Sequence, residues 1–75
     1  MERKQIKAEL FIGDYNRIAL RCAARNVFVE ADYIGKLLTG KRKGIRGKAL
    51  IIFEESEKVA LENIQLKNPN ILTNE

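Results

Sequence analysis

The sequence has no histidine and only one cysteine, Cys22, among its 75 residues. Without histidine, catalytic triads and histidine-based general base catalysis are excluded. A single cysteine permits no internal disulfide, and the usual zinc ligand sets are absent. Cys22 would need an activating partner to act as a nucleophile, and we interpret it as a buried structural residue. We therefore expect no enzymatic activity, no metal and no cofactor.

Long apolar runs are also missing. The longest run is far shorter than the ~18 residues of a membrane-spanning helix, so we expect no membrane partner. The first ten residues, MERKQIKAEL, are charged and lack the apolar region of a secretory signal. A lone free thiol fits a reducing compartment, and we expect a cytoplasmic protein. The acidic run Glu54, Glu55 and Glu57 is interpreted as a solvated turn rather than a metal site.

The chain is short enough to form one domain at most, predicted to span residues 1–66, with a flexible tail at 67–75. A domain of this size buries only ~60% of its unfolded surface. Small domains therefore usually add a disulfide, a metal or a partner subunit. Because the first two are excluded, we expect a homo-oligomer, with a compact monomer as the alternative.

Alternating apolar and polar residues predict most of the secondary structure as strands. The expected strands are about 7–12, 17–23, 27–30, 48–54 and 58–66, the last with a β-bulge at Glu62-Asn63. Residues 48–54 are apolar on both faces and predict a central strand. Two segments have a helical alternative, with Asp14 capping a helix over 17–23 and Ser56 capping one over 58–66.

The apolar period changes from Asp32 to Thr39, where Ile34, Leu37 and Leu38 follow helical spacing. Asp32 is the expected N-cap and Gly40 the expected left-handed residue after the helix. The predicted fold class is α+β, mainly β: about five short strands and one short helix in a small sheet or partly open barrel. Residues 1–7 are expected to be a frayed lead-in.

The most distinctive stretch is basic and flanked by glycines. Six of the fourteen Lys and Arg fall between Lys36 and Lys48, with no acidic residue among them. Glycines let such a segment approach a phosphate backbone closely, and its cations would neutralise phosphates. The candidate nucleic-acid-binding residues are Lys41, Arg42, Lys43, Arg46 and Lys48. Arg17, Arg21 and Arg25 would extend this surface if they were exposed on the same side; a merely solvated loop is the alternative.

The net charge of +4 favours a polyanionic partner. We therefore predict a non-enzymatic protein that binds DNA or RNA and regulates transcription. The alternative is a protein-interaction or assembly module whose basic loop meets an acidic protein partner.

Two resemblances agree with this prediction. The segment KALIIFEESEKVALENIQL, with the basic residues before it, resembles the C-terminal half of the RemA family of small bacterial matrix-gene regulators. That resemblance covers about half of the chain and implies a ring-forming DNA-binding protein, although Lys41-Arg42-Lys43 replaces the family's paired arginines. The shorter stretch IRGKALI resembles a strand of the tryptophan RNA-binding attenuation protein and the second Sm motif, which implies RNA contacts by Arg46 and Lys48.

Overall fold

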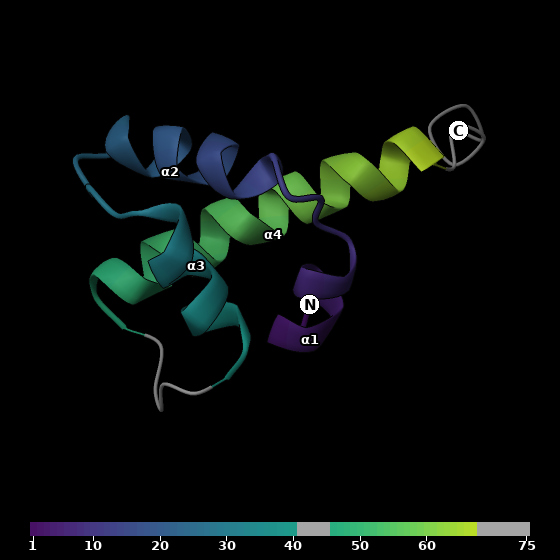
Figure 1. Cartoon of the computed structure of the whole chain (residues 1–75), viewed down its shortest axis with the longest axis horizontal. Helices are drawn as coiled ribbons and strands as arrows, with labels where there is room; N and C mark the ends of the chain where they lie inside the picture. The colour runs from purple at the N-terminus through teal and green to yellow at the C-terminus, as the bar shows by residue number, and fades with distance from the viewer. Residues whose placement is uncertain (41–45, 68–75) are drawn as a thin grey trace.

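In the residues that the computed structural model describes, 1–40 and 46–67, the chain forms four helices and no strand (Figure 1). They are α1 (Arg3–Ala8), α2 (Asp14–Ala23), α3 (Ala31–Leu38) and α4 (Lys48–Lys67). The long helix α4 runs along the molecule and packs against each of the other three. The predicted α+β, mainly β class is therefore wrong, and the described part of the chain is all-helical.

The core lies where the three shorter helices meet α4. Helices α2, α3 and α4 contribute apolar side chains with helical spacing, α1 contributes Ile6, and Val27 adds one from the segment between α2 and α3. The buried apolar residues are Ile6, Ile18, Cys22, Val27, Ile34, Leu37, Leu38, Ile52, Val59 and Ala60. None of the helices is apolar all round, so the fold depends on packing of their inner faces against one another.

Helix α2 shows why alternation misled the prediction of a strand at 17–23. In a strand, Ile18, Leu20 and Cys22 would share one face. The structure buries Ile18 and Cys22, which are four residues apart, and leaves Leu20 73% exposed. The helical alternative was correct, although Gly13 rather than Asp14 occupies the N-cap position. The Asp14 carboxylate accepts a hydrogen bond from the Phe11 backbone N–H at 2.9 Å and fixes the entry to the helix.

Helix α4 replaces the two strands and the acidic turn predicted between residues 48 and 66. Its buried positions include Ile52, Ser56, Val59 and Asn63, which are spaced four, three and four residues apart. That spacing follows one face of a helix. The slip in alternation at Glu62-Asn63 therefore reflects the helical period, and the predicted β-bulge is wrong. Helix α4 begins at Lys48, so Ser56 is an interior residue and its hydroxyl donates to the Ile52 carbonyl at 2.7 Å.

Helix α3 confirms the helix predicted from Asp32 to Thr39. It spans Ala31–Leu38, with Glu30 rather than Asp32 at the N-cap position. Gly40 has the expected left-handed backbone, with φ of 78°, and its N–H donates to the Leu37 carbonyl at 3.2 Å. The chain thus turns sharply at the end of α3, immediately before the basic segment.

The N-terminal residues are ordered by two contacts that the sequence did not reveal. Helix α1 begins with a capping box between Glu2 and Gln5 and buries Ile6 completely. The Met1 amino group pairs with Glu57 of α4 at 2.5 Å. The expected frayed lead-in at 1–7 and strand at 7–12 are therefore wrong, as is the strand at 27–30. Of the predicted tail, Lys67 ends α4, and 68–75 lie outside the described residues.

Candidate nucleic-acid interface

Two of the five predicted binding residues can be placed in the structure. Arg46 and Lys48 are exposed and flank Gly47 at the start of α4, while Lys41, Arg42 and Lys43 lie outside the described residues. Within residues 1–40 and 46–67, neither Arg46 nor Lys48 forms an ion pair. The first turn of α4 contains no acidic residue. Both cations therefore stand at the positive end of the helix dipole, which favours an anion.

A second group of cations lies on α1, where sequence reasoning had placed only a frayed lead-in and a strand. Arg3, Lys4 and Lys7 line a depression of about 460 Å³ together with residues 38–40, the C-terminal end of α3. The sequence does indicate this group, because Arg3 and Lys4 precede Lys7 by four and three residues, a spacing that places them close together on a helix.

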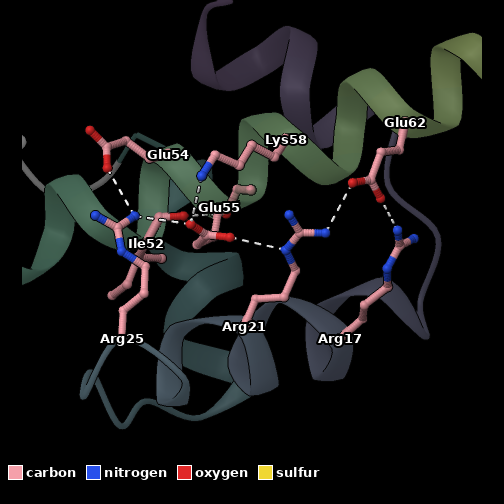
Figure 2. A network of polar contacts seen from close by, with 9 residues as sticks. Arg17, Arg21, Arg25, Ile52, Glu54, Glu55, Lys58 and Glu62 are labelled. Carbon is pink, nitrogen blue, oxygen red and sulfur yellow. Dashed lines mark hydrogen bonds and ion pairs between the residues drawn. The ribbon is translucent and has the colours of Figure 1, made fainter.

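The two arginines of α2 and Arg25, which follows that helix, do not join these cations. Arg17, Arg21 and Arg25 are spaced four residues apart; the first two lie in α2 and the third just after it. Figure 2 shows their side chains reaching toward the acidic side chains of α4. Arg17 pairs with Glu62. Arg21 also pairs with Glu62, at 3.0 Å. The prediction that these arginines would extend the basic surface is therefore wrong, because their charges are met within the fold.

Glu55 is the centre of this network. Its side chain is only 5% exposed, and its two carboxylate oxygens accept from three cations. Arg21 Nε lies 3.0 Å from Oε1, while Arg25 Nη1 and Lys58 Nζ lie 2.9 and 3.2 Å from Oε2. Arg25 also pairs with Glu54 at 3.0 Å. Glu54 and Glu55, which were interpreted as part of a solvated turn, thus join α4 to α2 and to the segment that follows α2.

Burial and hydrogen bonding act in opposite directions on two carboxyl groups. Burial alone would raise the pKa of Glu55, but the hydrogen bonds from Arg21, Lys58 and Arg25 outweigh it and lower that pKa. The same holds for Asp14: burial alone would raise its pKa, but hydrogen bonds from the Phe11 N–H and the Asn63 amide lower it. Asn63 of α4 donates to Asp14 Oδ2 at 2.8 Å. Both carboxylates therefore favour the folded state when they are ionised.

The lowered pKa of Glu55 predicts acid sensitivity. A carboxyl whose pKa is lower in the folded state stabilises the fold above its unfolded pKa, and this contribution is lost as pH falls through the folded pKa. We expect the urea midpoint to fall as pH decreases from about 5 to about 3. The Glu55→Gln variant should have a lower urea midpoint at about pH 5, and its midpoint should depend less on pH. Parallel pH curves for the two proteins would contradict this origin of the acid sensitivity.

Cys22 is buried in the core, as predicted, on the inner face of α2. Burial raises the pKa of its thiol, and the nearby Glu55 carboxylate acts in the same direction. The thiolate population at neutral pH is therefore small, which does not favour a nucleophilic role.

The described residues offer no group of three or more histidine, cysteine, aspartate or glutamate side chains placed to hold a metal ion. Among the same residues, no helix has both the length and the apolar character needed to cross a membrane. No family model, curated protein or solved structure matches the chain. The segment 48–66, which carried the resemblance to the RemA family, lies in α4 rather than in strands.

Proposed function

We propose that the protein is a non-enzymatic nucleic-acid-binding protein that regulates transcription and contacts phosphates through two groups of cations. The first is Arg3, Lys4 and Lys7 on α1; the second is the Gly-flanked segment 41–48 that ends with Arg46 and Lys48. The observation that carries the proposal is the separation of charge. Glu54, Glu55 and Glu62 of α4 are paired with Arg21 and Arg25, while Arg46 and Lys48 have no acidic partner in the described part of the chain.

The arrangement of α2 and α3 favours a DNA duplex as the target. These consecutive helices pack against each other, and α3 runs across the direction of α2 (Figure 1). Helix-turn-helix proteins place the second of two such helices in the major groove. The connection here, residues 24–30, is longer than the usual turn of 3–4 residues. Lys36 and Thr39 are exposed polar positions of α3 and its end that would meet base edges.

The basic segment follows α3 directly, so a helix in the groove would bring it to the flanking phosphates. Arg3, Lys4 and Lys7 lie beside the same end of α3 and would meet the same backbone. Phosphate contacts of this kind position a protein, and the groove contacts specify the sequence. These DNA contacts need only one copy of the chain. Self-association, which the chain length led us to expect, is a separate proposal on a different surface.

Two matched pairs of substitutions test the assignment. In the first, Lys4→Ala with Lys7→Ala, and in the second, Arg46→Ala with Lys48→Ala, each remove two charges from the proposed interface. Each pair should weaken duplex binding about tenfold or more and lower the salt slope by about 2, because each lost phosphate contact lowers it by about 1. Fluorescence anisotropy with labelled duplex DNA, single-stranded DNA and an RNA hairpin, at several salt concentrations, measures both quantities.

The control is Lys58→Ala with Lys67→Ala, which removes the same charge from α4, where both lysines are paired with acidic residues. This variant should bind nearly as the wild type. Equal weakening in all three pairs would show that net charge alone drives binding. Binding of no nucleic acid, with retention on an acidic protein surface, would favour the alternative, an interaction module with an acidic partner. Circular dichroism confirms that each variant is folded.

A further inference from the structure

The outer face of α2 carries an apolar groove that the nucleic-acid proposal does not use. Phe28, in the segment after α2, is 78% exposed, and Leu20 lies beside it on the helix, also exposed. The groove has a volume of about 450 Å³ and is lined by Asn16, Ala19, Leu20, Ala23, Phe28 and Val29. No charged side chain is among these residues. An uncharged groove with two large exposed apolar side chains is unusual on a chain in which 32% of residues are charged.

The apolar surface continues beyond this groove. A second depression, of about 320 Å³, shares Asn16 with the first and is lined also by Ile12 and Tyr15. Ile12 is 93% exposed. Its other lining residues, from α3, are Ala31, Gly35 and the single charged residue Asp32. The two depressions form one face, which we call the apolar face, centred on Ile12, Leu20 and Phe28.

The area of this face is large for a single small domain. Side chains of this size expose roughly 150–200 Å² each when fully accessible, so these three expose about 400 Å². That reaches the size of the largest apolar patch on a typical monomer. A standard protein–protein interface buries about 800 Å² on each partner, of which somewhat more than half is apolar. The apolar face thus supplies about the apolar share of one side of such an interface.

We propose that the apolar face is the contact surface for a second copy of this chain. A two-fold dimer requires a patch that is complementary to itself. Here a projecting aromatic ring, Phe28, lies beside a shallow groove, so the ring of each copy can enter the groove of the other. Because no lining residue of that groove is charged, two copies can meet without burying like charges. A chain of this length, with no disulfide, gains stability from such a partner.

The apolar face shares no residue with the cations of α1 or with Arg46 and Lys48. Dimerisation would therefore leave both groups of cations uncovered and present them twice. This inference does not depend on the proposed function, because self-association can be measured without nucleic acid.

Three variants test the proposal by sedimentation equilibrium from about 10 µM to about 1 mM, the range of Kd expected of a small interface. Phe28→Glu and Leu20→Glu should each weaken dimerisation by at least tenfold, because they place a charge in the contact. Leu66→Glu is the matched control: Leu66 is 77% exposed, almost the same as Phe28, but lies at the end of α4. It should dimerise like the wild type.

Backbone amide chemical shifts of the wild type, followed with concentration, provide a second measurement that needs no variant. The concentration-dependent shifts should fall in residues 12–35, around the apolar face. A wild-type protein that stays monomeric throughout the range would overturn the proposal. So would a dimer that Leu66→Glu dissociates while Phe28→Glu and Leu20→Glu leave it intact.

Discussion

Replacing Ile52 by alanine is expected to lower the free energy of unfolding by about 3 kcal/mol, the middle of the range for a fully buried isoleucine. Ile52 is 1% exposed and lies in the core on the inner face of α4. A 75-residue domain has a total stability of roughly 4–11 kcal/mol, so this loss is a large fraction of it. The melting temperature should fall by about 15 °C, measured by circular dichroism.

Leu50 provides the matched control, because it lies two residues earlier in the same apolar run but is 43% exposed. Leu50→Ala should cost about 1 kcal/mol or less. The comparison also tests the fold. In the central strand predicted at 48–54, residues 50 and 52 would share a face and cost similar amounts. In helix α4 they lie on opposite sides, so equal destabilisation by the two substitutions would contradict the helix.

This pair shows why the sequence predicted strands where the chain forms helices. The run Ala49 to Phe53 is apolar at every position, and such a run has no period that separates a buried strand from a helix. Length decides between them, and the period that identifies α4 becomes visible only over its full twenty residues. The prediction ended the strand at Glu54, because acidic residues usually mark an exposed turn. The helical period that continues across Glu54 was therefore missed.

Helix α3 and the buried Cys22 were predicted correctly because local information is sufficient for them. Ile34, Leu37 and Leu38 have unambiguous helical spacing, and Gly40 supplies the left-handed residue that ends a helix. Cys22 lies four residues after Ile18, and residues four apart share a face in a strand and in a helix, so Cys22 is buried in either case.

The candidate interface could be predicted only in part. The exposed cations Arg46 and Lys48 follow from the sequence, because glycines and the absence of acidic residues keep that stretch basic. The pairing of Arg17, Arg21 and Arg25 with α4 carboxylates joins residues about thirty to forty-five positions apart, and composition does not reveal it. The cations of α1 were missed because the first seven residues, of which four are charged, resemble a disordered lead-in.

The network between α2 and α4 also connects stability with the proposed function. It absorbs three arginines and most of the acidic charge of α4, so the exposed positive charge is concentrated beside the ends of α3 and α4. A variant that weakened the network would leave carboxylates and arginines without their partners. The freed arginines would then be able to bind phosphate. Stability and nonspecific binding should therefore change together when the network is disrupted.

Glu55→Gln should disrupt this network with the largest effect of any single charge change in it, about 2 kcal/mol of unfolding free energy and about 10 °C in melting temperature. Glutamine keeps the shape of the side chain but replaces one acceptor oxygen with an NH₂ donor. That donor must face Arg21 on one side or Arg25 and Lys58 on the other, all of which are donors themselves. Because these cations are partly exposed, water recovers some of their solvation, and the cost stays below that of a fully buried pair.

Glu62→Gln is the control within the same network. Glu62 also meets two arginines, Arg17 and Arg21, but its side chain is 40% exposed. Exposed ion pairs contribute about 1 kcal/mol or less, so this variant should melt within a few degrees of the wild type. Denaturant unfolding at neutral pH and low salt measures both variants. Equal losses from the two substitutions would show that burial of Glu55 adds nothing, and that the network acts only as a set of surface ion pairs.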